Sequence, residues 1–215
     1  MTLHNCFSKA ALVAAAIGLL AIGPLQGEKL TLVPVDNEQT KVFLEGTSNV
    51  RDWDATSTKI DGVLEVESNG TWSEAAFDPD SLVENGLRAT VRIPADSLIS
   101  DSRRLTSNMH DYLEVKAHRY IEFELKSVAL NGRVDPDARS FTTDAEGLLT
   151  VTGNQREIAF PVEWAREGNL LILSGKAELK MSDFGIDPPT MMFGTLRAAD
   201  EVTVEFQWVL QPSGN

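Results

Sequence analysis

The chain has 215 residues, a length that suits one domain with a sizeable apolar core. Its 32 acidic and 19 basic residues give a formal net charge of -13 at pH 7. This balance argues against a nucleic-acid partner and against docking on an anionic lipid surface, because no basic stripe is present to replace phosphate counterions.

Residues 1–27 are typical of a secretory signal peptide. An apolar run over 10–23 has the length of a signal-peptide hydrophobic region and is too short to span a bilayer. Cleavage after Gly27 fits the small-residue rule, so we expect a mature domain over 28–215 in the periplasm or outside the cell. A short membrane anchor that stays attached is the alternative. The one cysteine, Cys6, lies in this leader, so we expect the mature fold to depend on its core and not on disulfides.

Alternation of apolar and polar residues predicts that most of the remaining chain forms strands. Asn69-Gly70 is a hairpin turn signal. Gly175 lies inside a long predicted strand and indicates a bend or bulge there. The predicted strands are 41–46, 59–67, 87–93, 120–126, 141–152, 158–164, 169–182 and 202–210.

One stretch, from Asp101 to about Leu113, has a helical period instead. Its apolar residues follow the i, i+4, i+7, i+8 spacing that places side chains on one helical face. They are Leu105, Met109, Tyr112 and Leu113. A single amphipathic helix that leads into a sheet must cover an opening or an edge of that sheet, so we expect a lid or plug.

The strands have one apolar and one polar face, which is typical of an antiparallel sheet that is wet on one side. Such a sheet closes into a barrel or stacks as a sandwich, and periodicity alone leaves both open. An outer-membrane barrel is a third alternative, although two tyrosines and four tryptophans are few for interfacial aromatic girdles. No repeat or linker divides the chain, so we expect one all-β domain.

The residues give little support to a catalytic or metal site. His110 and His118 are eight positions apart and the mature chain has no cysteine, so neither histidine is expected to bind zinc. Carboxylate pairs such as Glu122 and Glu124 fall at polar strand positions, which favours a solvated face over a glycosidase pair. We therefore predict no catalytic residue, no metal and no cofactor. An exported hydrolase that uses carboxylates is the alternative.

Three motifs, taken in order, resemble the YceI-like family of exported lipid-binding proteins. They are NMHDYL (108–113) followed by IEFEL (121–125), GLLTVTG (147–153) followed by IAFPV (158–162), and MSDFGIDPP (181–189). Order and spacing match from about Gly46 to Leu210. Two positions depart from the family pattern: Arg119 stands where relatives often have proline, and Arg51 where some have histidine.

The resemblance implies a single antiparallel, lipocalin-like β-barrel of about eight strands with a short helical lid, a size that can hold one small ligand. It also implies non-catalytic binding or carriage of an amphiphilic lipid, such as a polyisoprenoid or a quinone-like molecule. A solid-core interaction or stress-response module is the alternative, and the presence of a cavity separates the two. The oligomeric state stays open, with a homodimer among the options.

Two groups of side chains are then expected to contact the lipid. Inward apolar residues would bury its tail at about 25 cal/mol per Å², and polar residues at the mouth would orient its head group. The expected apolar lining is Leu64, Val91, Met109, Phe123, Leu149, Phe160, Phe206 and Trp208. The expected polar mouth is Arg51, Asp52, Arg103 and His110.

Overall fold

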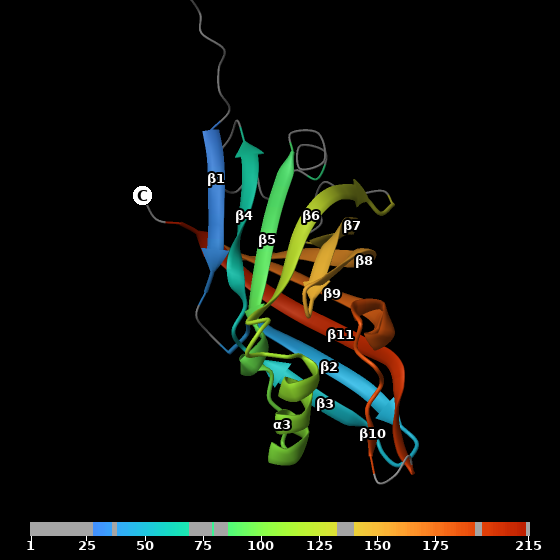
Figure 1. The fold of residues 1–215 in the computed structure, drawn as a ribbon. Helices are drawn as coiled ribbons and strands as arrows, with labels where there is room; N and C mark the ends of the chain where they lie inside the picture. Colours follow the sequence, from blue (N-terminus) through green and yellow to red (C-terminus); the bar gives the residue numbers. More distant parts are fainter. Residues whose placement is uncertain are drawn as a thin grey trace, which may run out of the picture.

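The computed structural model describes residues 28–35, 38–68, 79, 86–132, 140–191 and 195–213 (Figure 1). The strands in this part of the chain are β1 (Glu28–Pro34), β2 (Lys41–Ser48), β3 (Trp53–Ser57), β4 (Asp61–Ser68), β5 (Leu87–Pro94), β6 (Tyr120–Leu130), β7 (Ser140–Val151), β8 (Asn154–Glu167), β9 (Leu170–Lys180), β10 (Thr190–Met191) and β11 (Leu196–Pro212). The helical segments are η1 (Ala95–Ser97), α3 (Arg103–Tyr112) and η2 (Met181–Phe184).

Eight of the described strands form a closed antiparallel barrel. Their order is β1-β4-β5-β6-β7-β8-β9-β11, and β11 closes the ring by pairing with β1. In the closing register Leu32 lies opposite Pro212, and Pro34 lies opposite Leu210. The predicted all-β barrel with a short helix is therefore confirmed, and the sandwich is excluded.

The lower part of the molecule is built differently, because only the C-terminal end of the long β11 pairs with β1. The preceding part of β11 pairs with β2 instead, and β2 pairs with β3. The free side of β3 reaches the segment after β5 through Thr56, whose N–H donates to the Ile99 carbonyl at 2.8 Å and whose carbonyl accepts from the Ile99 N–H at 3.0 Å. In Figure 1, β2, β3, β10 and α3 lie below the barrel.

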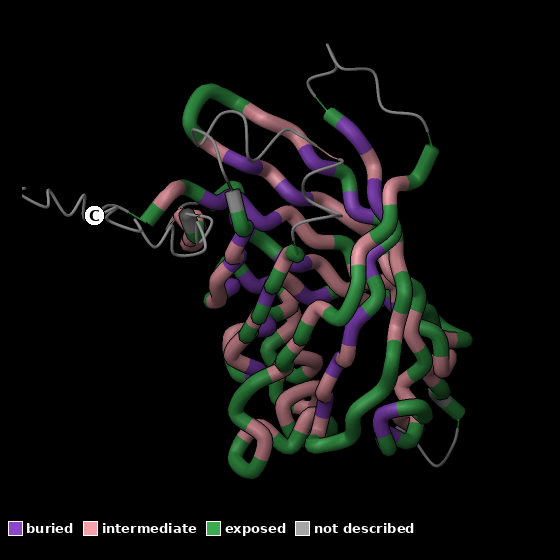
Figure 2. The backbone as a smooth tube through the Cα atoms, turned by 90° about the horizontal axis from the view of Figure 1, so that it is seen from above, coloured by how far each residue is buried: buried purple, intermediate pink, exposed green. Residues whose placement is uncertain are grey.

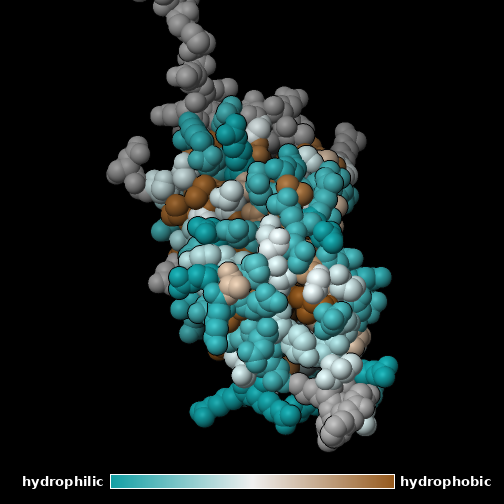
Figure 3. Space-filling view, in the orientation of Figure 1, coloured by the Kyte–Doolittle hydropathy of each residue, from teal (hydrophilic) through white to brown (hydrophobic). Residues whose placement is uncertain are grey.

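Side chains alternate between the interior and the outside along each strand, as the sequence pattern predicts. In β7 the buried positions are Phe141, Thr143, Ala145, Gly147, Leu149 and Val151. The same alternation of buried and exposed positions is visible along the strands in Figure 2. The face shown in Figure 3 is mainly hydrophilic with scattered apolar spots. Inward apolar residues are the reverse of the pattern that an outer-membrane barrel needs.

Some details of the sequence-based prediction differ from the structure. β1, β3 and the short β10 were not predicted, and β6, β8 and β11 are longer than expected. Gly175 is not a bulge in the pairing of β9 with β11, which continues through it without a shift, whereas the pairing of β9 with β8 ends at Gly175. This glycine instead leaves room for the Phe206 ring, which a Cβ atom would approach to 2.7 Å. The predicted Asn69-Gly70 turn lies outside the described residues.

The upper half of the barrel is a solid core. It includes two indoles, Trp164 and Trp208, each only 3% exposed. Around them lie buried side chains from β1, β4, β5, β7, β8, β9 and β11: Leu32, Leu64, Val66, Ala89, Phe141, Ala145, Val162, Leu171, Leu173 and Leu210. Packing of this kind provides most of the stability of the barrel, because burial of apolar surface is the dominant favourable contribution to folding.

The two buried indoles differ in their hydrogen bonding, which gives a matched pair of substitutions. Trp164 Nε1 donates to the buried Thr143 Oγ1 at 2.9 Å, whereas the described residues offer Trp208 Nε1 no partner. Trp164→Phe leaves the Thr143 hydroxyl buried without this bond, while Trp208→Phe removes an unsatisfied donor. Since the two changes remove the same atoms, Trp164→Phe is expected to cost about 1–3 kcal/mol more in unfolding free energy. Urea titration of both variants measures the difference, and equal losses would contradict the prediction.

Candidate functional site

A cavity of about 560 Å³ lies in the lower half of the molecule, between α3, the inner faces of β2 and β3, the lower part of β11, and η2. Its size falls within the roughly 300–1,000 Å³ of small-molecule sites and is several times the ~150 Å³ that holds one benzene ring. The barrel therefore has two interiors, one solid and one hollow.

Helix α3 forms one wall of this cavity. The predicted apolar face is confirmed, because the structure brings to the cavity wall the side chains of Leu105, Met109 and Tyr112 and that of the C-cap residue Leu113. Ser102 caps the helix by accepting from the Leu105 N–H at 3.3 Å. Thr106 adds a second restraint, since its Oγ1 accepts from the Ser100 N–H at 3.0 Å and donates to the Ser100 carbonyl at 3.2 Å.

Inward strand positions and the η2 turn form the remaining apolar walls. The strand residues include Val42 and Leu44 of β2, Ile93 of β5, Ile121 of β6, Leu149 and Val151 of β7, Leu179 of β9, and Val202 and Val204 of β11. The turn contributes Phe184 and Ile186, which are both buried. It is fixed to the β7–β8 hairpin by Thr152 Oγ1, which donates to the Phe184 carbonyl at 2.6 Å. Such a lining suits an apolar ligand or an apolar tail.

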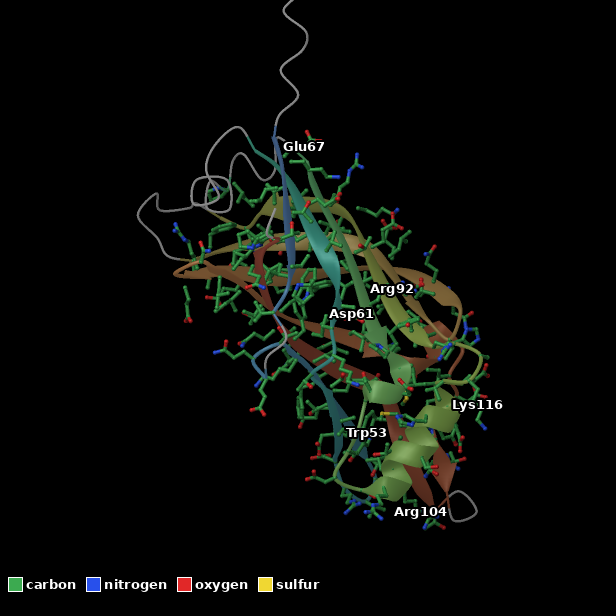
Figure 4. All side chains as sticks on the ribbon, turned by 90° about the vertical axis from the view of Figure 1, so that its left-hand side faces the viewer. Trp53, Asp61, Glu67, Arg92, Arg104 and Lys116 are labelled. Atoms are coloured by element: carbon green, nitrogen blue, oxygen red, sulfur yellow. The ribbon has the colours of Figure 1, made fainter. Side chains whose placement is uncertain are left out.

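The charged residues of the cavity wall are of one sign. Arg51, Arg104 and Lys180 contribute to it, and none of the described lining residues is an aspartate or a glutamate. All three cations are exposed, so their charged ends reach water. Figure 4 shows Arg104 at the lower end of α3 and Trp53, another wall residue, on the neighbouring β3. In a chain with a net charge of -13, this local excess of positive charge favours an anionic group at the mouth.

Beside the mouth, Asp200 connects η2 to β11. Its carboxylate accepts from the Ser182 N–H at 2.8 Å and from the Ser182 hydroxyl at 2.5 Å. The hydroxyl bond, the amide bond and the nearby Lys180 charge together lower the pKa of Asp200. Because these contacts favour the ionised carboxylate, their contribution to stability is present at neutral pH and is lost as the pH falls through the lowered pKa.

The eight apolar residues that were expected to line a ligand site fall into three groups. Met109 and Leu149 lie on the cavity wall. Phe123, Phe160 and Phe206 form a cluster of rings deeper in the barrel. Leu64, Val91 and Trp208 belong to the packed upper core.

The four polar residues expected at the mouth lie at three different kinds of position. Arg51 lies on the cavity wall. Asp52 and Arg103 are exposed next to wall residues but do not line the cavity. The His110 ring faces the segment that follows η1, and its Nε2 lies 2.8 Å from the Leu98 carbonyl oxygen. Its position therefore anchors α3 to the segment after η1.

Several wall residues were not predicted from the sequence. Arg104 lies in the predicted helix and Lys180 near the end of the predicted strand 169–182, and neither pattern indicates that both residues would meet one cavity. Trp53 lies in the unpredicted β3. Phe184 and Ile186 belong to the MSDFGIDPP motif, so a signal was present in the resemblance, but no ligand role was assigned to them.

Three other features of the described residues bear on the catalytic, metal-binding and membrane-spanning alternatives. Glu65, Glu122 and Glu124 form surface ion pairs with Lys29, Arg92 and Lys126 at 2.7, 2.9 and 2.7 Å. Across the described ranges, no three His, Cys, Asp or Glu side chains gather as metal ligands would. No helix in those ranges is both long and apolar enough to cross a bilayer.

Comparison with known sequences gives one match and one negative result. The sequence profile of the family described as YceI-like domain matches residues 34–210. No match was found among curated proteins.

Among solved structures, the chain is similar to BcnA from Burkholderia cenocepacia, with 19% identity and a TM-score of 0.58, covering 80% of this chain and 96% of that one. It is also similar to a domain from Saccharophagus degradans described as polyisoprenoid binding and implicated in plant cell wall breakdown, with 11% identity, a TM-score of 0.59, and 85% and 98% coverage. For the YceI protein of Campylobacter jejuni the values are 14%, 0.52, 73% and 82%. At these identities the likeness shows the fold.

Proposed function

This chain belongs to the YceI-like domain family, and from that premise we propose that it binds or carries an amphiphilic lipid without catalysing a reaction. The observation that carries the proposal is the apolar cavity of about 560 Å³ inside the barrel. The tail, a polyisoprenoid or a quinone-like chain, lies against the apolar walls, where each buried methylene contributes about 0.8 kcal/mol. The description of the Saccharophagus degradans domain as polyisoprenoid binding supports this ligand class.

The head group of the lipid lies at the mouth in this proposal. Arg51 provides the contact that the sequence suggested, and Arg104 and Lys180 join it on the same wall. Asp52 and Arg103 lie on the outer side of this rim, and His110 acts by holding α3 in place. An exported hydrolase fits less well, since no carboxylate lies among the described wall residues to act as acid or base.

Two measurements test the proposal. Organic extraction of protein purified from its native host, followed by mass spectrometry, should release a lipid with an apolar tail in near-stoichiometric amount. Titration of delipidated protein with a fluorescent prenyl lipid should then give saturable binding. Absence of both lipid in the extract and binding in the titration would contradict lipid carriage.

Export is part of the proposal. Residues 1–27 lie outside the described residues, and we infer from the apolar run over 10–23 that they form a cleaved leader. We therefore expect Glu28, the first residue of β1, at the start of the secreted or periplasmic protein. N-terminal sequencing after cell fractionation measures it. A chain that starts at Met1 or Thr2 would revive the anchored alternative.

A further inference from the structure

Three phenylalanine rings follow one another across the interior of the barrel. Phe123 of β6 and Phe160 of β8 have ring centroids 5.4 Å apart at an interplanar angle of 57°. Phe160 and Phe206 of β11 follow at 5.8 Å and 84°, an edge-to-face contact. We call these three residues the aromatic belt. Edge-to-face and tilted contacts at such distances are favourable for aromatic pairs.

The strands between the three rings carry glycine at the level of the belt. Gly147 of β7 lies beneath the Phe123 ring, and a Cβ atom at this position would collide with that ring. Gly175 of β9 is paired with Phe206, whose Cε1 would lie 2.7 Å from an added Cβ. The two glycines therefore let the rings lie across β7 and β9, so that the belt extends from β6 to β11.

The belt separates the two interiors of the barrel. On the same face of β11, Val204 lies two positions before Phe206 and lines the cavity, whereas Trp208 lies two positions after it and is 3% exposed in the core. On β7 the same step leads from Leu149 on the cavity wall, past Gly147, to the buried Ala145. Two strands far apart in the ring thus change from hollow to solid at one level.

The same change occurs on β6, which pairs with β7, and on β5, which pairs with β6. On β6, Ile121 and Leu125 both pack against the core cluster, but only Ile121 lines the cavity, and Phe123 of the belt lies between them. On β5, Ile93 lines the cavity, while Val91 is paired with Phe123 and packs against the core. None of the three rings is among the residues that line the cavity. The belt therefore lies directly behind the inner end of the cavity, between the lining residues and the packed core, and forms the floor at that level.

We propose that the aromatic belt sets the longest tail that the protein accepts. This inference rests on the proposed function and specifies its ligand class as amphiphiles whose apolar chain ends at Phe123, Phe160 and Phe206. Up to that length each added methylene should tighten binding by about fourfold. In a tail longer than this limit, each further methylene stays outside the cavity at its mouth, so it should no longer increase the affinity.

Shortening a belt residue should move this limit to longer tails. A buried ring covers roughly 150–250 Å² and a methylene about 30 Å², so Phe160→Ala or Phe206→Ala should admit about five to eight more carbons. Phe43→Ala is the matched control. Phe43 lies on β2 between the wall residues Val42 and Leu44, so its ring points to the outer face, and its truncation should leave the limit unchanged.

The experiment titrates delipidated protein with straight-chain alkyl phosphates of increasing length, each below its critical micelle concentration, so that the head group stays constant. Circular dichroism and thermal melting establish that each variant is folded. Phe160→Leu, a milder change that should give a smaller shift, replaces Phe160→Ala if the latter does not fold.

The outcomes distinguish the inference from the function on which it rests. A limit that moves to longer tails in the belt variants, and not in Phe43→Ala, supports the belt as the floor. A limit that stays the same in folded belt variants, or that moves equally in Phe43→Ala, overturns it while leaving lipid binding intact. Failure of every alkyl phosphate and of the prenyl lipid to bind the unaltered protein would contradict the proposed function itself.

Discussion

Gly62→Ala is expected to lower the free energy of unfolding by about 3 kcal/mol or more, through strain of roughly 1–3 kcal/mol and overpacking of roughly 1–3 kcal/mol. Gly62 lies in β4 with φ of +145°, a region that side chains rarely adopt. A Cβ atom there would also collide with the Thr90 carbonyl oxygen of the neighbouring β5. Relief requires movement of two paired backbones, because the collision is not with a flexible side chain.

Gly168→Ala is the matched control for this prediction. Gly168 has φ of +59° in the β8–β9 turn, and an added Cβ would meet nothing within 4 Å. It should therefore cost only the left-handed backbone penalty of about 1–2 kcal/mol. Chemical denaturation of both variants gives the comparison. Equal losses would mean that the Thr90 contact adds nothing to the strain.

The strands that sequence reasoning predicted correctly are those with side chains large enough to mark both faces. β5 and the first part of β6 alternate apolar with polar or charged residues; β5 was placed almost to the residue, and the start of β6 was placed correctly, although β6 continues to Leu130. β3 was missed because its sequence WDATS buries only small residues, Ala55 and Ser57. β1 was missed for another reason: a short segment next to a leader gives no local sign that it will close a barrel with β11.

For the candidate site, periodicity predicted the direction of a side chain but not its height in the barrel. Leu64, Val91 and Trp208 point inward as expected, yet they belong to the packed core, while Leu149 lines the cavity. A period of two is the same along the whole strand, so it cannot show where a solid interior becomes a hollow one. The apolar face of helix α3 was easier to predict, because all four of its predicted residues line the cavity.

That difference in height predicts opposite results for two tryptophan substitutions. Val204→Trp places an indole on the cavity wall, where it occupies the space of the tail. Binding of a prenyl lipid should weaken by at least about 100-fold, since an indole displaces enough tail contact to cost ~2.7 kcal/mol or more. The denaturant midpoint of the lipid-free protein should change little, because the added ring enters empty space.

Val91→Trp places the same ring at the level of the belt, opposite Phe123 and against the core. Here no empty space receives it, so overpacking should cost about 1–3 kcal/mol of stability. The pair of variants is compared by urea unfolding without lipid and by titration with a fluorescent prenyl lipid. A Val204→Trp protein that is stable and binds lipid as the unaltered protein does would place the tail elsewhere. Equal destabilisation of both variants would mean that the lower interior is as solid as the upper one, and the hollow half of the barrel would lose its role as the lipid site.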